Sequence, residues 1–476
     1  MNSDEFKEKG FEIIEYISNY FDTVAKRPVV TTERPGFMKE LVPLKAPEKA
    51  DEWEDIMKDM DDVIIPGFSH WAHPHFHAYF PTGCSLASVL GTLLTGAFGC
   101  SGSSWSTSPA STELEVIILE WLAKAFDLPK KFLFYEKGSK GGGCLQGSAS
   151  ECTLLVCLAA QKIALQKLKK ENPSIPEGEL LASLVAYCSK EAHSSVEKAC
   201  LIAMVTVRII DTDERFRFRG KELEEAVKQD LKDGLHPFLV VGTLGTTAST
   251  SVDKFDEIGP ICKKYELWLH VDGAYGISAL ICPEFRHFAN GLEYASSIAV
   301  NPHKWLLMHF DCSSFWIDDR CRFVKALSAD PDSLSADADA KIIDFSHWGT
   351  GDRIRFRALK MWVVMRTYGV TGMQKFIRNH VQLAKYFEEL VQKDHRFEVI
   401  NDVNFGTICF RLKSSNDANA KLLASIVQTR KLFMVPASLG GSYVIRFNIS
   451  YEHMSENDIF NAWEIITTHF EDLNNI

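Results

Sequence analysis

The sequence predicts an α/β protein with a large, mostly parallel or mixed sheet, a helical N-terminal segment and a small C-terminal α+β domain. Between about residues 85 and 375, short apolar strands such as "SLVAYCS" and "LWLHVDGAYG" alternate with helical blocks. This order is typical of a sheet that helices cover on both faces. Residues 3–25 repeat apolar side chains at helical spacing. After residue 396, "FEVINDV", "FGTICFRLK" and "SYVIRFNIS" have the character of antiparallel strands.

These elements predict three domains, covering residues 1–84, 85–375 and 376–476. The first holds two amphipathic helices, of which the second, "PEKADEWEDIMKDMDDVI", ends near Pro66, and the extended segment "HPHFHAYFPTG". Those helices bury little by themselves, so we expect them to pack on the rest of the chain or on a second copy. The second domain adds the strands "PFLVVGTLGTT", "SSIAVNPHKW" and "DCSSFWI", and the third opens with the helix "FIRNHVQLAKYFEELVQ".

Composition limits the classes of function. The chain has 476 residues and a net charge of −11, which argues against nucleic acid or an anionic membrane as a partner. Twelve cysteines lie mostly in apolar runs and form no CxxC pair, as expected for reduced thiols of a cytoplasmic protein. The start "MNSDEFKEKG" lacks the features of a secretory signal, and no apolar run reaches the roughly 18 residues of a membrane span.

Three polar residues follow the ends of predicted strands. Asp272 ends "WLHVD", Lys304 follows "SSIAV", and His193 follows "AYCS" at the start of a helix. Ligands of open α/β sheets bind at the carboxyl ends of strands. A desolvated lysine becomes a nucleophile for carbonyl groups, and a pyridinium-type cofactor needs a carboxylate at its ring nitrogen. Lys304 and Asp272 supply these two groups.

The segment "KGGGCLQGSASECTLLVCLAAQKIALQKLKK" predicts a phosphate site, because a glycine-rich loop runs straight into a long helix. Ser148 and Ser150 fall at its first turn, where free N–H groups and the helix dipole favour an anion. The nucleotide motifs GxxxxGK[ST] and GxGxxG after a strand are absent from the sequence, so we do not expect a nucleoside triphosphate or a dinucleotide.

Each residue also has an ordinary structural interpretation. Alone, Lys304 is compatible with a surface lysine, Asp272 and Ser148 with helix caps, and His193 with a hydrogen-bonded core histidine; their combination favours a cofactor site. The histidines in and just before "HPHFHAYFPTG" suggest zinc, but side chains two apart on a strand share a face without converging, so we expect no metal. These histidines are His70, His73, His75 and His77.

The motifs "NPHKW", "HVDGAYG", "AHSSVEKA", "GTLGTT", "QGSASE" and "HPHFHAYFPTG" resemble those of the pyridoxal-phosphate-dependent group II amino-acid decarboxylases. The resemblance covers nearly the whole chain and is strongest to the branch that acts on aromatic amino acids and histidine and includes the aromatic acetaldehyde synthases. It implies fold type I of the pyridoxal-phosphate-dependent transferases. It also implies an obligate homodimer with the active site at the interface.

The resemblance assigns a role to each matching residue. Lys304 would hold the pyridoxal phosphate aldehyde, Asp272 would pair with the ring nitrogen, and His193 would stack on the ring, with Ala274 on the other face and Thr247 at the ring side. The phosphate and the lysine link would be surrounded by Ser148, Ala149, Ser150, Asn301 and His303. Thr82 would approach the substrate carboxylate, and the entrance would be lined by Trp71, Tyr79 and Phe80.

The chain departs from the family at the lid and in the substrate pocket. The lid tyrosine that helps to protonate the carbanion is replaced by Ser333, and no tyrosine occurs between Tyr294 and Tyr368. In the family, losing this tyrosine can divert the reaction to oxygen and give an aldehyde, ammonia and peroxide; retention of His193 and of the order Tyr79–Phe80 argues against that diversion. The more polar pocket residues are Ser101, Ser103 and Arg353, of which the two serines are equally compatible with ordinary interface positions.

The resemblance therefore implies a cytoplasmic, homodimeric decarboxylase of an aromatic L-amino acid. The substrate would be dihydroxyphenylalanine, tyrosine, tryptophan or histidine, in the chemistry that also makes catecholamines. Two alternatives stay open, namely decarboxylation coupled to oxidative deamination, and a catalytically weakened homologue that binds the cofactor.

Overall fold

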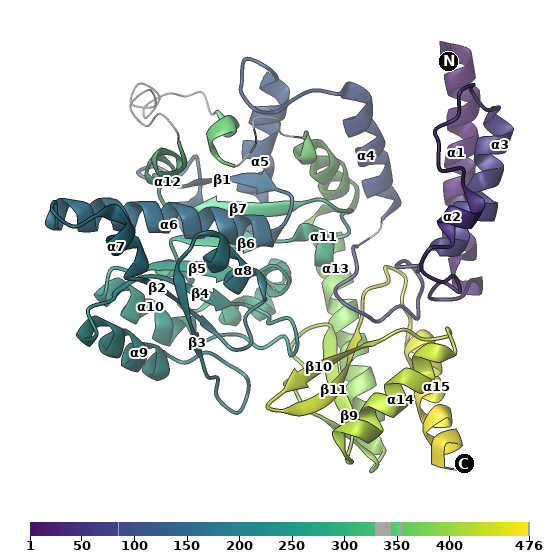
Figure 1. Cartoon of the computed structure of the whole chain (residues 1–476). Helices are drawn as coiled ribbons and strands as arrows, with labels where there is room; N and C mark the ends of the chain where they lie inside the picture. The colour runs from purple at the N-terminus through teal and green to yellow at the C-terminus, as the bar shows by residue number, and fades with distance from the viewer. Residues whose placement is uncertain (84, 329–343, 350, 352–354, 475–476) are drawn as a thin grey trace.

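The computed structural model describes residues 1–83, 85–328, 344–349, 351 and 355–474. Figure 1 shows a large sheet domain, a smaller domain built on a second sheet, and N-terminal helices that stand beside them. The N-terminal part contains the helices α1 (Ser3–Thr23), α2 (Met38–Leu41) and α3 (Trp53–Asp59). Among the described residues, no helix combines the length and the apolar character needed to cross a membrane.

The large sheet has seven strands in the order β1-β7-β6-β5-β4-β2-β3. Strands β3, β2, β4, β5 and β6 are parallel, whereas β7 runs antiparallel to both of its neighbours. The expected mostly parallel or mixed sheet is confirmed. The strands are β1 (Gly142–Gln146), β2 (Leu184–Ser189), β3 (Thr206–Ile210), β4 (His236–Thr243), β5 (Trp268–Asp272), β6 (Ser297–Val300) and β7 (Ser313–Ile317).

Two of these strands were not predicted. The glycine-rich run before Gln146 is strand β1, and the loop proper is only Gly147–Ser148. The glycines permit close pairing, because a Cβ on Gly143 would lie 2.3 Å from the carbonyl oxygen of Phe315 on β7. The edge strand β3 was missed because three of its five residues are exposed, so it lacks the continuous apolar run of the central strands.

Helices cover both faces of the large sheet (Figure 1). Successive strand residues alternate between two cores; on β5, for example, Leu269 packs in one core and Trp268 in the other. One face is covered by α6 (Ala149–Glu171), α8 (Ser195–Ile202) and α12 (Arg320–Leu327), next to α7 (Glu177–Ala182). The other packs against α5 (Pro109–Ala125), α9 (Gly220–Lys232), α10 (Phe255–Lys264) and α13 (Arg357–Lys393).

Helix α13 connects the large and the small domain and is interrupted at Gly369, where φ is 62°. The small sheet has the order β10-β11-β9-β8 with antiparallel pairing throughout. Its strands are β8 (Phe397–Val399), β9 (Thr407–Leu412), β10 (Val435–Leu439) and β11 (Ser442–Asn448), and its other helices are α14 (Asn416–Gln428) and α15 (Glu456–Asn474). The sequence predicted three of these strands and missed β10, a short strand that contains Pro436.

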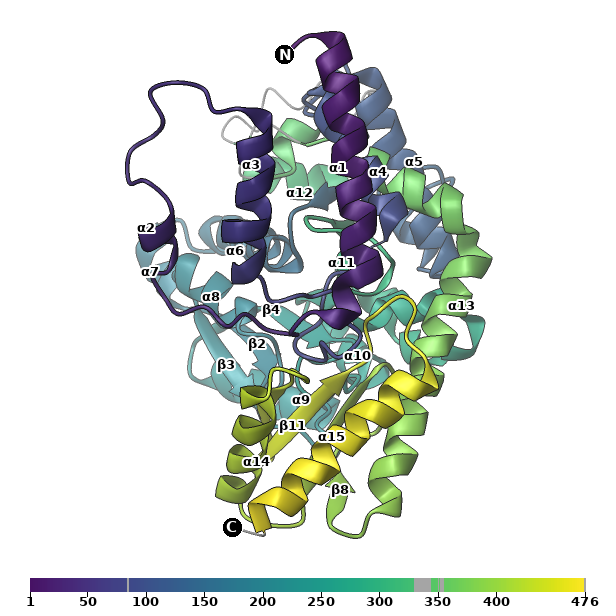
Figure 2. The ribbon, with the colours of Figure 1, turned by 90° about the vertical axis from the view of Figure 1, so that its right-hand side faces the viewer.

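The N-terminal helices make few contacts with the rest of the chain. Helix α1 has no buried residue; Figure 1 shows it standing apart from the sheets, and in Figure 2, turned by 90°, it lies in front of α4. Trp53 of α3 donates to Glu12 of α1 at 2.6 Å. The segment that follows, residues 70–83, returns to the small domain, where His77 N–H donates to the Phe433 carbonyl at 2.9 Å.

Candidate active site

The predicted constellation lies at the carboxyl edge of the parallel strands. Asp272 is the last residue of β5, Lys304 lies in the short helix α11 (Pro302–Trp305) after β6, and His193 lies between β2 and α8. The three groups are close enough to act on one another. Asp272 raises and Lys304 lowers the pKa of His193, and Asp272 also raises the pKa of Lys304. The expected convergence of an acid, an imidazole and an amine is therefore observed.

Lys304 lies in a desolvated position. Its side chain keeps some accessible surface, but burial is the main cause that lowers its pKa, and the nearby Arg446 guanidinium lowers it further. Its Nζ lies 5.1 Å from the centroid of the Phe80 ring. A lowered pKa increases the fraction of neutral amine, which is the form that attacks a carbonyl group.

Asp272 is 5% exposed and is held by the turn that follows it. The Ala274 N–H donates to Asp272 Oδ1 at 3.0 Å, and the Ala274 carbonyl accepts from the Asn301 N–H at 3.1 Å. These bonds connect the loop after β5 to the loop that carries Lys304. They leave the second Asp272 oxygen available for a ring nitrogen.

The predicted phosphate site lies at the N-terminus of α6. Ser148 is the N-cap, and its Oγ accepts from Glu151 N–H at 3.2 Å. Ala149 N–H donates to Asn301 Oδ1 at 3.0 Å, which links this helix end to the lysine loop. Ser150 is exposed. Capping and anion binding use the same groups, so this geometry is compatible with both.

The two histidines of the site are held in defined orientations. His193 Nδ1 accepts from the Ser195 N–H at 3.1 Å, so the neutral ring carries its proton on Nε2, and burial lowers its pKa. His303 Nδ1–H donates to the Cys312 carbonyl at 2.6 Å, and its ring centroid lies 4.4 Å from that of Phe310. Burial lowers the pKa of His303 to about 3. Both rings are therefore neutral near pH 7.

The entrance residues form an aromatic cluster. Trp71 and Tyr79 stack with ring centroids 5.8 Å apart, and Phe80 stacks on Tyr275 at 4.1 Å. Thr82 follows in the same segment. Gly83 N–H donates to the His303 carbonyl at 2.9 Å, so the entrance segment is attached directly to the loop of Lys304.

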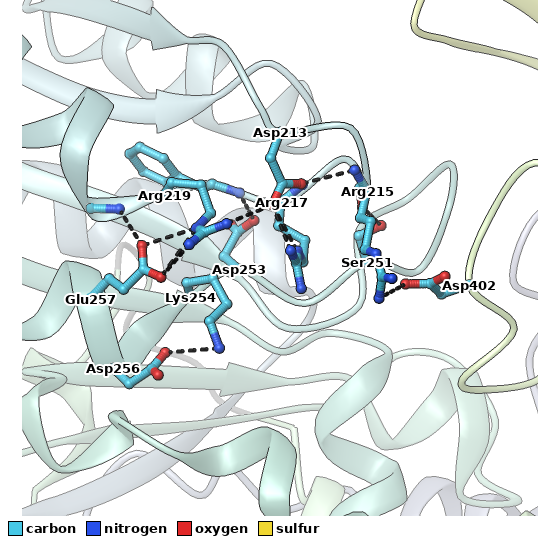
Figure 3. Close-up of polar contacts among 12 residues, drawn as sticks. Asp213, Arg215, Arg217, Arg219, Ser251, Asp253, Lys254, Asp256, Glu257 and Asp402 are labelled. Atoms are coloured by element: carbon cyan, nitrogen blue, oxygen red, sulfur yellow. Dashed lines mark hydrogen bonds and ion pairs between the residues drawn. The ribbon is translucent and has the colours of Figure 1, made fainter.

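Thr247 lies in a loop, after β4, that is fixed from both domains. On the large-domain side, Asp253 accepts from the Phe218 and Thr243 N–H groups at 2.9 and 2.7 Å. Figure 3 shows Asp253 beside a network of ion pairs that reaches the small domain at Asp402. On the small-domain side, Asn401 Nδ2 donates to the Ser249 carbonyl at 2.9 Å.

Two predicted residues, Ser101 and Ser103, are not brought to Lys304 by the described contacts. Ser101 Oγ donates to Ser103 Oγ at 3.3 Å, and the Ser103 carbonyl accepts from the Phe345 N–H at 2.7 Å. These contacts tie the serine loop to residues 344–348. Arg353, and Ser333 of the lid, lie outside the described residues.

The histidines of the entrance segment have partners other than a metal. His77 Nδ1 lies 2.9 Å from the Asn448 carbonyl, His75 Nδ1 lies 3.1 Å from the Lys431 carbonyl, and His70 Nδ1 lies 2.9 Å from Tyr20 Oη. His73 Nδ1 accepts from the His75 N–H at 2.9 Å. Within the described part of the chain, no group of three His, Cys, Asp or Glu side chains has the arrangement of a metal site.

Sequence reasoning missed Arg446 and Tyr275, which both pack against Phe80. The signal for Arg446 was present in "SYVIRFNIS", where a charged residue occupies a position inside a predicted strand. The eleven cysteines that the structure describes are free thiols, and nine of them are buried.

Residues 35–413 match the family model described as the pyridoxal-dependent decarboxylase conserved domain. The aromatic-L-amino-acid decarboxylase of Sus scrofa is 46% identical over 468 residues, covering 98% of this chain and 96% of that protein. The histidine decarboxylase of Drosophila melanogaster is 43% identical over 478 residues. The match covers 100% of this chain and 56% of that protein.

Solved structures agree with these sequence matches. Tryptophan decarboxylase from Catharanthus roseus, in complex with L-tryptophan, aligns with a TM-score of 0.94 and 36% identity over 99% of both chains. The 4-hydroxyphenylacetaldehyde synthase of Rhodiola rosea aligns with a TM-score of 0.92 and 34% identity, also over 99% of both chains. The fold is thus common to decarboxylases and to an aldehyde synthase.

The residues present fit pyridoxal phosphate. A desolvated amine, a buried carboxylate with a free oxygen and a helix N-terminus with an exposed serine hydroxyl lie at one edge of the sheet. Their chemistry matches the aldehyde, the ring nitrogen and the phosphate of this cofactor.

Proposed function

Because the chain belongs to the pyridoxal-dependent decarboxylase family and is a carboxy-lyase that uses pyridoxal phosphate, we propose that its substrate is an aromatic L-amino acid. The class comprises dihydroxyphenylalanine, tyrosine, tryptophan and histidine, and the products are the amine and CO2. The observation that carries the proposal is the meeting of Lys304, Asp272 and His193 at one sheet edge in a chain this similar to aromatic-amino-acid decarboxylases.

The protein's own residues supply orientation and charge. When bound, pyridoxal phosphate supplies an aldehyde that condenses with amines and a ring that accepts the electron pair of the bond to the carboxylate. Lys304 would offer a neutral amine to the aldehyde and would give way to the amine of the substrate. The Asp272 carboxylate would hold a proton at the ring nitrogen. His193 and Ala274 would cover the two ring faces, and the phosphate end would be held by Ser148, Ser150 and Asn301.

Orientation decides which bond of the amino acid breaks. The bond that is held perpendicular to the ring overlaps best with the electron sink, so the site must hold the carboxylate out of the ring plane. Trp71, Tyr79 and Phe80 form the apolar side of the entrance on which an aromatic substrate ring would rest. The protein must then deliver a proton to Cα before the amine leaves.

A homodimer with the active site at the interface is part of the proposal. Helix α4 (Leu86–Phe98) follows the entrance segment directly and exposes a row of apolar side chains, and α1 has no buried residue. Exposed apolar surface of this extent favours contact with another chain. The exposed residues of α4 are Leu86, Leu90, Leu93, Leu94 and Phe98. Ser101 and Ser103 follow this helix and would then face the site of the partner.

We also propose the division into domains 1–84, 85–375 and 376–476 and a cytoplasmic location, the latter supported by the eleven free thiols of the described residues. A role in making catecholamines follows if dihydroxyphenylalanine is the substrate. The relative polarity of Ser101, Ser103 and Arg353 would favour a substrate that carries polar groups on its ring.

The second candidate is decarboxylation coupled to oxidative deamination. The observation in its favour is that no tyrosine occurs between Tyr294 and Tyr368, so the lid position corresponds to Ser333. The similarity to an aldehyde synthase is compatible with this chemistry. A third candidate is a weakened homologue that holds the cofactor without turnover.

One experiment separates the three candidates. The holoenzyme is incubated with each of the four amino acids under air and under nitrogen, and amine, aldehyde, peroxide and CO2 are quantified. The proposal predicts amine and CO2 in equal amounts, independent of oxygen. Aldehyde with equimolar peroxide, formed only under air, would establish the second candidate, and absence of CO2 with fully loaded protein would establish the third.

A further inference from the structure

Arg446 is a buried cation without an anionic partner. It lies on β11 and is 5% exposed, and its Nε and Nη2 have no hydrogen-bond partner among the described residues. Burial lowers its pKa, and the other groups that act on it are Cys409 and Tyr275, with no Asp or Glu side chain among them. A buried charge without a partner is strongly unfavourable, so such a group usually serves a ligand.

The guanidinium of Arg446 is directed at the active site. Arg446 pairs in register with Cys409 of β9, and Cys409 Sγ donates to the Ala248 carbonyl of the large domain. This face of the small sheet is therefore turned toward the large domain (Figure 1). Arg446 Cζ lies 4.8 Å from the Phe80 ring centroid, and Lys304 Nζ lies 5.1 Å from the same centroid.

The site thus holds two desolvated basic side chains, those of Lys304 and Arg446, around one aromatic ring. Asp272 acts on Lys304 but is not among the groups that act on Arg446. The phosphate of the cofactor is expected at the N-terminus of α6. The remaining anion that the reaction brings into the site is the carboxylate of the amino acid, because its amine must be at Lys304 to react.

We propose that Arg446 binds the α-carboxylate of the substrate through the two guanidinium nitrogens that lack a partner. This inference rests on the proposed function, since it requires an amino acid as ligand. A planar guanidinium fork binds a carboxylate through two parallel hydrogen bonds and so fixes its orientation as well as its place. Thr82, which the family resemblance places near the carboxylate, carries no charge and would assist this contact only as a neutral group.

Such a contact acts mainly on binding. Negative charge leaves the carboxylate as the bond to Cα breaks, so an ion pair to Arg446 is stronger with the bound substrate than in the transition state. Interactions of this kind lower KM without raising kcat. Removing the guanidinium is therefore expected to raise KM more than it lowers kcat, whereas a merely structural defect would reduce both or reduce the amount of folded protein.

The test compares ligands that keep only one of the two functional groups. The acids 3-phenylpropanoate, 3-(4-hydroxyphenyl)propanoate, 3-(indol-3-yl)propanoate and 3-(imidazol-4-yl)propanoate have the carboxylate and no amine, and phenylethylamine, tyramine, tryptamine and histamine have the amine and no carboxylate. Dissociation constants for holoenzyme are measured by calorimetry. Arg446→Met is expected to raise the dissociation constant of the tightest-binding acid by about 10- to 100-fold. The dissociation constant of the amine with the same ring is expected to rise by less than about threefold.

Two further variants separate binding from folding. Arg446→Lys keeps the charge but loses the fork, and it is expected to restore part of the acid affinity. Arg411→Met is the matched control: Arg411 is buried on the neighbouring strand β9, but it is satisfied by the Leu412 and Ser414 carbonyls and by Asn416. This control is expected to leave the ratio of acid to amine affinity unchanged.

The proposal would be overturned if Arg446→Met weakened the binding of acids and amines equally, or if it weakened the binding of neither. Wild-type protein that binds none of the four acids would overturn it as well. The assay does not depend on turnover, so it is distinct from the test of the proposed function. A protein that binds acids through Arg446 but releases no CO2 would refute the function and keep this inference.

Discussion

The imidazole of His77 stacks on the ring of Phe447, with ring centroids 3.7 Å apart and an angle of 19° between the planes. His77 is 0% exposed, and its Nδ1 lies 2.9 Å from the Asn448 carbonyl. Phe447 neighbours Arg446 on β11, so this contact joins the entrance segment to the strand that carries the unpaired guanidinium. The position of Phe80 relative to Arg446 and Lys304 therefore depends on a neutral histidine.

Burial lowers the pKa of His77 to about 3, and this predicts a loss of stability in acid. Between about pH 6.5 and pH 3 the unfolded chain binds a proton at this residue and the folded chain does not, so stability falls as pH falls, by up to about 1.4 kcal/mol per pH unit. His77→Phe removes this contribution. Its free energy of unfolding, measured by denaturant titration at several pH values, is expected to be lower than wild type at pH 7.5 and to approach or exceed it near pH 5. Curves that stay parallel to wild type, as expected for the exposed control His395→Phe, would contradict this account.

The buried carboxyl group of Asp253 predicts that stability falls as pH rises, which is the opposite of the effect expected for His77. Burial raises its pKa to about 7 although two backbone N–H groups donate to it. The folded chain therefore holds a proton that the unfolded chain has lost above about pH 4, and stability from this group is present at low pH and lost as pH rises through 7. Asp253→Asn is expected to be less stable than wild type at pH 5, by about 1–2 kcal/mol for a lost hydrogen bond, and closer to wild type at pH 8. A stability difference that grows with pH would contradict the assignment.

At Gly83, the entrance segment packs tightly against the backbone that follows Lys304. A Cβ at this position would lie 2.8 Å from Leu307 N and 2.9 Å from Leu307 Cα, which are backbone atoms that cannot move aside. Gly83→Ala is expected to lower the free energy of unfolding by about 1–3 kcal/mol and to speed the release of pyridoxal phosphate, measured by the loss of visible absorbance on dilution.

The matched control for this substitution is Gly178→Ala. Gly178 lies in helix α7 with nothing within 4 Å of its Cβ position, so alanine is expected to be neutral or slightly stabilising there. If both variants release the cofactor at the wild-type rate, close packing at Gly83 does not hold the site.

The exposed row on α4 predicts a self-association surface. Leu90 and Leu94 are 52% and 43% exposed one turn apart. The double substitution Leu90→Glu and Leu94→Glu places two charges on this row and is expected to convert a dimer into a monomer, measured by light scattering after size exclusion. Leu201→Glu changes a side chain that is 77% exposed on α8 and is expected to leave the mass unchanged. A double variant that keeps the wild-type mass would show that the dimer interface does not include this row on α4.

The sequence predicted the positions of the three strand-end residues better than it predicted the edges of the fold. Asp272, Lys304 and His193 follow strands whose continuous apolar runs identify them, so their convergence follows from parallel strand topology. Strands β1 and β3 were missed because glycines and exposed residues hide the strand pattern. Arg446 was missed because its proposed role depends on a contact between the small domain and Phe80, across more than 360 residues of chain, which no local pattern carries.

The central claim is that Lys304 is the covalent anchor of pyridoxal phosphate. The direct measurement is reduction of the freshly purified holoenzyme with borohydride, followed by proteolysis and mass spectrometry of every lysine-containing peptide. The account predicts that the reduced cofactor is attached to Lys304 and that Lys304→Ala loses both the attachment and the visible absorbance. Attachment to another lysine in the wild-type protein, with Lys304 unmodified, would contradict it.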